Sequence, residues 1–108
     1  MDIFSENLIK NAQDLNCIGI NELSWKYTYV IEAIRSLELN NFIILGGDVY
    51  KIDCNEIITP TVDSWYFNRS NNKDDVIESC KKAIDYIRRY HNKNGENFYY
   101  ALTYESLN

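Results

Sequence analysis

FIILGGDVYKID, residues 42–53, is the part of the sequence from which the fold class is inferred. Its first four residues are an unbroken run of β-forming apolar side chains, typical of a strand that is covered on both faces. From Asp48 to Asp53 successive side chains are predicted to point to alternate faces of a strand, with Val49, Lys51 and Asp53 on one face and Asp48, Tyr50 and Ile52 on the other. Gly46 and Gly47 lie between the two parts. They predict a tight hairpin, because the primed two-residue turns need positive φ angles, and a β-bulge at the same glycines is the alternative.

Two more segments have the alternation of strands. Val62–Phe67 and Asn97–Tyr104 each place large side chains on one face. Pro60 cannot donate a backbone hydrogen bond, so residues 56–61 are predicted to be a sheet edge or a loop. These segments together predict a mostly antiparallel sheet.

Three helices are predicted from apolar residues at helical spacing. The first spans Asp2–Leu15 and the third Lys73–Asn92. The second is predicted to have Ser24 as its N-cap and to end near Leu39. The third has the clearest pattern, with acids in its first turns and bases in its last, as the helix dipole favours. The element order is then ααβββαβ, and we expect an α+β fold with the helices packed on the sheet.

Length and composition limit the architecture and the compartment. With 108 residues, 45% of them hydrophobic, the chain is expected to be a single domain over residues 1–108. Neither a secretion signal nor a membrane-spanning run is apparent, so a cytoplasmic location is predicted. Cys17, Cys54 and Cys80 are an odd number without CxxC spacing. They are predicted to be buried free thiols, and not disulfide or zinc ligands.

The negative charge is concentrated in the middle of the chain. The formal net charge is −5, and residues 38–63 contain five acids against one lysine. An acidic chain repels the phosphate backbone, so direct binding of nucleic acid is not expected. A basic protein partner is compatible with the acidic segment.

The sequence offers few residues for catalysis. His91 is the single histidine, and it is predicted to be a surface residue favoured by a helix C-terminus. Neither a GxSxG motif nor a Cys/His pair with the context of a nucleophile is present. Asp48 and Asp53 are the closest pair of central acids, but their odd spacing places them on opposite faces of a regular strand. We therefore predict a protein that is not an enzyme, without catalytic residues, metal or cofactor.

Aromatic residues lie beside the central acids. Trp65 and Tyr66 follow Asp63, and Tyr50 precedes Asp53. Tyrosine and tryptophan are enriched at the energetic centres of protein interfaces, inside a charged rim. Ordinary packing on the faces of the sheet is the alternative explanation for the same residues.

The segments around the glycines and Pro60 resemble those of a known family. Residues 42–50, FIILGGDVY, and 58–66, ITPTVDSWY, are followed by Ser79 and by DYI at 85–87. This ordered set resembles the immunity protein 40 family of bacterial polymorphic toxin systems. The resemblance implies a protein encoded beside a secreted toxin, which binds that toxin in the cytosol and neutralises it. It carries over no catalytic residue.

The resemblance and the acidic segment together predict a surface that binds a protein partner. A basic toxin domain, such as a nuclease, would be attracted to an acidic inhibitor. The candidate contact residues are Asp48, Tyr50, Asp53, Glu56, Asp63, Trp65 and Tyr66. Two other functions stay open at this point. One is an intracellular scaffold module that pairs through a sheet edge, and the other is a small metal-dependent hydrolase that uses the central acids.

Overall fold

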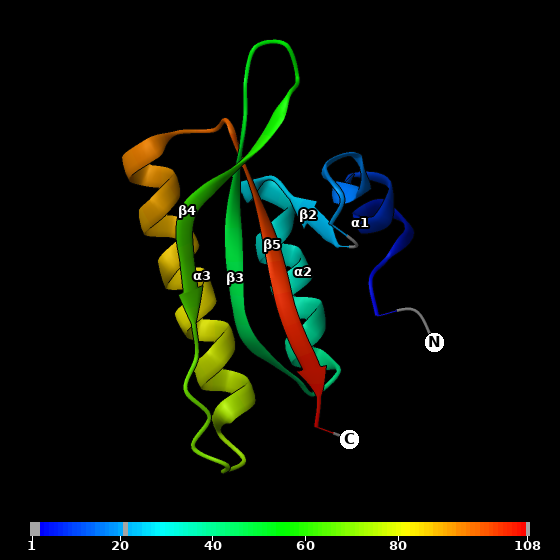
Figure 1. Ribbon diagram of the computed structural model, residues 1–108. Helices are drawn as coiled ribbons and strands as arrows, with labels where there is room; N and C mark the ends of the chain where they lie inside the picture. The colour runs from blue at the N-terminus through cyan, green and yellow to red at the C-terminus, as the bar shows by residue number, and fades with distance from the viewer. Residues whose placement is uncertain (1–2, 21, 108) are drawn as a thin grey trace.

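The fold is a five-stranded antiparallel sheet with two long helices packed on one face, seen behind the sheet in Figure 1. The computed structural model describes residues 3–20 and 22–107. The strands, in the spatial order β1-β2-β5-β3-β4, are β1 (Gln13–Asp14), β2 (Leu23–Trp25), β5 (Phe98–Ser106), β3 (Phe42–Ile52) and β4 (Ile58–Tyr66). The helices are α1 (Glu6–Lys10), the 3₁₀ helix η1 (Leu15–Ile18), α2 (Tyr27–Leu39) and α3 (Asp75–Asn94). The predicted α+β fold is confirmed.

β3 continues through its two glycines, so the predicted hairpin is wrong and the alternative bulge is right. The pairing of β3 with β5 shifts register between Ile44 and Gly46. A Cβ atom on Gly47 would overlap the Trp65 ring and the carbonyl oxygen of Ala101. Glycine is needed here because a tryptophan and a neighbouring strand pack directly on the backbone, and not because the chain turns.

β4 forms one edge of the sheet and contains Pro60, as expected of an edge strand. It begins at Ile58, four residues before its predicted start, because residues 58–60 pair with residues 50–52 of β3. The register between the two strands then shifts between Asp48 and Tyr50. In this irregular part the Thr61 hydroxyl donates to the Val49 carbonyl oxygen at 2.8 Å.

The N-terminal part differs most from its prediction, one helix over Asp2–Leu15, whose first residue lies outside the described residues. α1 is five residues long, and the chain then pairs with β2 as β1. The Asp14 side chain starts η1 by accepting a hydrogen bond from the Asn16 N–H at 2.8 Å. Leu8 and Leu15 are both fully buried, but in cores on opposite faces of the sheet. The helical spacing of apolar residues therefore continues from α1 into η1, although these are two separate elements.

Ser24 is in β2 and does not cap a helix, so this prediction is wrong. It pairs with Ala101, and its hydroxyl donates to the Gln13 carbonyl oxygen at 3.2 Å. α2 begins three residues later, at Tyr27, and ends at Leu39. α3 agrees with its predicted range to within two residues at each end.

The sheet separates two apolar cores. We call the face toward α2 and α3 the helix face, and its core includes Trp25, Ile44, Val49, Trp65 and Tyr100. We call the other side the open face. Its smaller core, which includes a residue of η1, is formed by Leu15, Tyr50, Ile58 and Ala101. Over the described part of the chain, the helix face is therefore covered by two long helices and the open face by the short segment that contains η1.

The three cysteines are all free, and their burial differs from the prediction. Cys80 is buried in the helix-face core, but Cys17 and Cys54 are exposed, so the prediction is wrong for these two. Cys17 lies in η1 and Cys54 in the loop after β3, at positions outside both cores. Within the described residues, none of the helices combines the length and the apolar character needed to cross a membrane.

Candidate partner-binding surface

Asp48 lies in the middle of the open face. It is paired with Ala101 of β5 and Ser64 of β4, and its side chain is exposed. The next residue, Val49, points into the helix-face core, and Tyr50 points back to the open face. β3 therefore presents an acid and a tyrosine on the same side, although Tyr50 is only 5% exposed.

Glu22 brings a second carboxylate close to Asp48. Partial burial raises the pKa of Glu22, and the negative charge of Asp48 raises it further. Burial also raises the pKa of the Tyr50 phenol, and Asp48 and Glu22 both add to this effect. The carboxylates of Glu22 and Asp48 therefore create a negative potential around Tyr50. This potential disfavours further negative charge and favours a cation.

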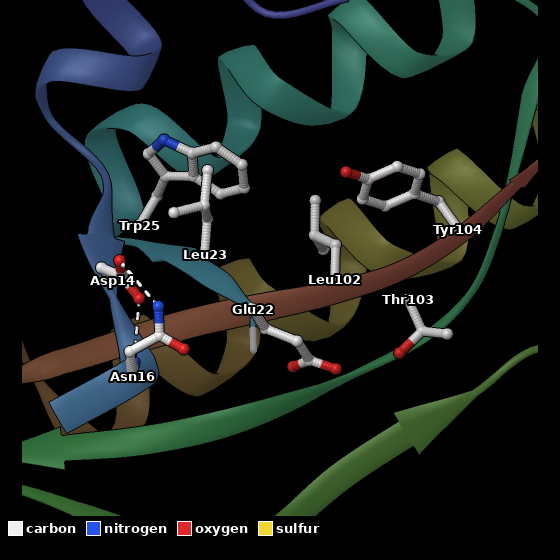
Figure 2. Close-up of a pocket in the computed structure, with 8 residues that line it drawn as sticks. All are labelled: Asp14, Asn16, Glu22, Leu23, Trp25, Leu102, Thr103 and Tyr104. Atoms are coloured by element: carbon white, nitrogen blue, oxygen red, sulfur yellow. Dashed lines mark hydrogen bonds between the residues drawn. The ribbon is translucent and has the colours of Figure 1, made fainter. Parts of the chain in front are cut away.

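A hollow of about 390 Å³ opens where β2 leaves the edge of β5. Figure 2 shows side chains on both sides of the β5 ribbon, because successive residues of a strand point to opposite faces. One side is apolar and is formed by Leu23, Trp25, Leu102 and Tyr104. The other side is polar and includes Glu22 and Thr103, with Asp14 and Asn16 completing the lining.

The apolar side of the hollow is held in place by contacts with the N-terminal segment. The Trp25 indole N–H donates to the Leu8 carbonyl oxygen at 2.8 Å. The Phe4 ring packs edge-on against Trp25, with 5.0 Å between centroids, and against Tyr104, with 5.9 Å. These contacts hold the apolar side of the hollow in place.

Asp53 and Glu56, two of the predicted contact residues, lie in the loop between β3 and β4. This loop forms the tip at the top of Figure 1, and both side chains are exposed. Asp53 Oδ1 accepts hydrogen bonds from the backbone N–H groups of Asn55 at 2.8 Å and Ile57 at 3.0 Å. Asp53 therefore shapes the loop, while Glu56 adds charge to its tip.

Asp63 and Trp65 lie on the other side of the sheet, toward α3. The Tyr90 hydroxyl donates to Asp63 Oδ2 at 2.7 Å. Burial and this hydrogen bond to a carboxylate raise the pKa of Tyr90 to about 12. The Trp65 ring is 7% exposed and stacks on Tyr86 with 4.8 Å between centroids. These two residues are therefore part of the packing between β4 and α3.

Tyr66 is the exposed aromatic residue of the predicted set, with 69% of its surface accessible. The Lys82 ammonium donates to its carbonyl oxygen at 2.6 Å and lies 5.5 Å from the centre of its ring. The predicted residues consequently do not form one cluster. Asp48 and Tyr50 lie on the open face, Asp53 and Glu56 at the loop tip, and Asp63 and Trp65 between β4 and α3, while Tyr66 is exposed beside Lys82.

The residues around the hollow were missed because their elements are short. β2 has three residues, too few for an alternating pattern, and Glu22 precedes it in a stretch that looks like a break between helices. The alternation over Asn97–Tyr104 predicts a strand that includes Thr103 and Tyr104, but the sequence does not show which part of that strand lacks a neighbouring strand. The charge count could not identify Glu22 either, since it lies outside the acidic segment 38–63.

Groups that could bind a metal are not found in the described part of the chain. No set of three or more His, Cys, Asp or Glu side chains is arranged there to hold an ion. The His91 ring lies flat on the Tyr27 ring, with 3.9 Å between centroids and 4° between planes. The histidine therefore takes part in packing between α3 and the start of α2.

Comparison with known proteins identifies one family. The family model described as Immunity protein 40 matches residues 14–104 of the chain. The matched range begins in β1 and ends in β5, and so includes the whole sheet apart from a few terminal residues. The chain matches no curated protein and no solved structure.

Proposed function

Because the chain belongs to the immunity protein 40 family, we propose that it binds and neutralises a cognate toxin protein in the bacterial cytosol. The observation that carries this proposal is the family match, which covers nearly the whole fold. Neutralisation by binding needs a complementary surface and no chemical step. The toxin meets the acidic residues of the open face and the loop tip, where Asp48, Glu56 and Glu22 lie.

The distribution of charge supports this choice of surface. α3 contains five lysines and arginines against three acids, and it lies on the helix face. The open face carries Glu22 and Asp48. A basic toxin domain, such as a nuclease, is attracted to the acidic open face and repelled by α3. Such asymmetry orients the encounter and speeds association.

The test uses the C-terminal domain encoded by the neighbouring toxin gene. Asp48→Lys combined with Glu56→Lys should slow its association on the order of tenfold at low ionic strength and reduce the salt dependence of the rate. Stopped-flow fluorescence measures the rate, and co-expression with the toxin domain measures protection of cells.

The matched control is Glu78→Lys combined with Asp85→Lys. Both residues are exposed on α3, and the change in net charge is the same. Equal slowing by the two double variants would show that net charge acts at a distance and that the open face has no special part. Unchanged association rates in both double variants would contradict the electrostatic model. If the wild-type protein does not bind the toxin domain at all, the proposed function is wrong.

A further inference from the structure

One edge of the sheet is left open in the middle of the molecule. β3 pairs with β5 along its whole length, from Phe98 to Ser106. On the other side of β5, β2 pairs with Tyr100 and Ala101 only. In Figure 1 the lower half of β5 has no strand beside it on the right, within the residues that the structure describes. Among the described residues, no strand therefore pairs with the backbone of residues 102–105 on that side.

The segment before β2 turns away from β5 because Glu22 is hydrogen-bonded to Leu15 of η1. The Leu15 N–H donates to the Glu22 carbonyl oxygen at 3.0 Å. This hydrogen bond turns the backbone toward β1 at the position where a longer β2 would have met Thr103. The hollow shown in Figure 2 opens at this point, directly beside the unpaired part of β5.

The two edges of the sheet are protected to different degrees. β4 has the features that natural edge strands use against unwanted pairing. It contains Pro60, its register with β3 is irregular, and Lys82 of α3 occupies the Tyr66 carbonyl oxygen. The part of β5 from Leu102 to Glu105 contains no proline, and Glu105 is its single charge. Such an edge is a template for another strand.

We propose that an extended, basic segment of the toxin adds to the sheet as a strand along residues 102–105 of β5. The inference rests on the proposed function and specifies how the toxin is held. Alternate side chains of the added strand point to the two faces of the sheet. Those on the helix side meet Leu102, Tyr104 and Trp25, and those on the open side meet Glu22 and Thr103.

Charge complementarity selects a basic segment. Asp14 and Glu22 line the hollow, and Asp48 lies close enough to Glu22 to raise its pKa. A lysine or arginine on the open side of the added strand relieves the repulsion between these carboxylates, while its aliphatic part packs along the edge. A second copy of this chain is a poorer occupant, because pairing of β5 with β5 would bring two Glu22 carboxylates toward each other, while residues 102–105 contain no cation to offset them.

Hydrogen exchange in the presence and absence of the same toxin domain tests the backbone pairing. Amides of residues 102–105 that exchange quickly in the free protein should slow at least tenfold in the complex. Amides of the protected edge β4, such as that of Val62, should keep their rates and serve as the internal control. A complex that forms without slowing exchange at residues 102–105 overturns the inference and leaves the proposed function standing.

A charge reversal at the hollow tests the basic character of the segment. Glu22→Lys should weaken toxin binding about tenfold or more, since a buried like-charge contact replaces a favourable one. Glu32→Lys on α2 is the matched control, with an exposed side chain and the same change in charge, and should have little effect. Equal effects of the two variants would also overturn the inference. So would dimerisation of the free protein that slows exchange at residues 102–105 in the absence of toxin. Failure of the toxin to bind at all overturns it together with the proposed function.

Discussion

Trp65 and Tyr66 are neighbours in β4, and they show how different the two faces of the sheet are. Trp65 is 7% exposed, lies against Gly47 and stacks on Tyr86 of α3. Tyr66 is 69% exposed and contacts the end of one lysine. On the helix face an aromatic ring fills space between two layers. Away from that face, the same type of residue is left available to the surroundings.

The comparison extends to the whole sheet. Among the residues that the structure describes, the helix-face core contains sixteen buried residues and the open-face core contains four. Burial of apolar surface is the main source of stability, so the helix face holds the fold together. The open face contributes less and carries carboxylates whose mutual repulsion is unfavourable. One face therefore specifies the fold, and the other contributes less of the packing.

The largest expected effect is the loss of stability on truncating Trp65. Trp65→Ala should lower the free energy of unfolding by about 3 kcal/mol, because it removes a buried ring and leaves a cavity beside Tyr86. Tyr66→Ala, one residue away, should change it by less than about 1 kcal/mol, since its side chain is exposed. Urea unfolding followed by circular dichroism measures both. Similar losses from the two variants would mean that the faces do not differ in this way.

A smaller effect is expected from a buried hydroxyl on the helix face. Ser79 is fully buried in α3, where its Oγ accepts from the Ile44 N–H at 2.9 Å and donates to the Val76 carbonyl oxygen at 3.0 Å. Ser79→Ala removes the acceptor of a buried N–H of β3 and should cost about 2 kcal/mol. The control, Ser64→Ala, changes an exposed hydroxyl opposite Asp48 and should cost less than about 0.5 kcal/mol. Denaturant midpoints of the two variants decide this point, and equal shifts would contradict it.

The helix face could be predicted from the sequence because its signals are long and regular. α3 repeats apolar residues over five turns with charges that match its dipole, and its range is correct to within two residues. β4 could be placed at an edge because Pro60 has no N–H to donate. The fold class follows from these elements, since an amphipathic helix and alternating strands have to cover each other.

The candidate site could not be predicted to the same degree, because it is built from short elements and from close approaches. Gly47 looks like a turn residue, and the positions of the Trp65 ring and the Ala101 carbonyl oxygen explain why it cannot have a side chain. Leu15 continues the spacing of the first helix but belongs to the opposite face. Glu22 becomes a neighbour of Asp48 through pairing between β2 and β5, which joins residues far apart in the sequence.

The smallest expected effects concern two acids whose pKa values are shifted in opposite directions. Asp75, at the start of α3, is 3% exposed and accepts hydrogen bonds from the Ser70 hydroxyl and from the N–H groups of Ser70 and Asn71. The bond from the Ser70 hydroxyl is the main reason why the pKa of Asp75 lies below its ordinary value of 3.8. The pKa of Glu22 lies above its ordinary value of 4.5, because of burial and then Asp48.

Opposite pKa shifts give opposite dependence of stability on pH. The lowered pKa of Asp75 stabilises the fold above pH 3.8, and this contribution is lost as the pH falls through the folded-state value. Asp75→Asn should therefore destabilise the protein near neutral pH and flatten the loss of stability in acid. The raised pKa of Glu22 means that its ionisation costs stability once the pH rises above 4.5. Glu22→Gln should stabilise the protein slightly at pH 7 and have no effect near pH 3.

Urea midpoints measured between pH 3 and pH 7 for the wild type and both variants provide the test. Loss of stability in Glu22→Gln at pH 7 would show that Glu22 stabilises the fold, which would contradict the proposed contrast between the two faces. A gain in stability together with weaker toxin binding would show that Glu22 destabilises the free protein and contributes to binding. Residues at binding sites are commonly retained at some cost to stability, and Glu22 would then be such a residue, unfavourable in the free protein and favourable once a cation of the toxin lies beside it.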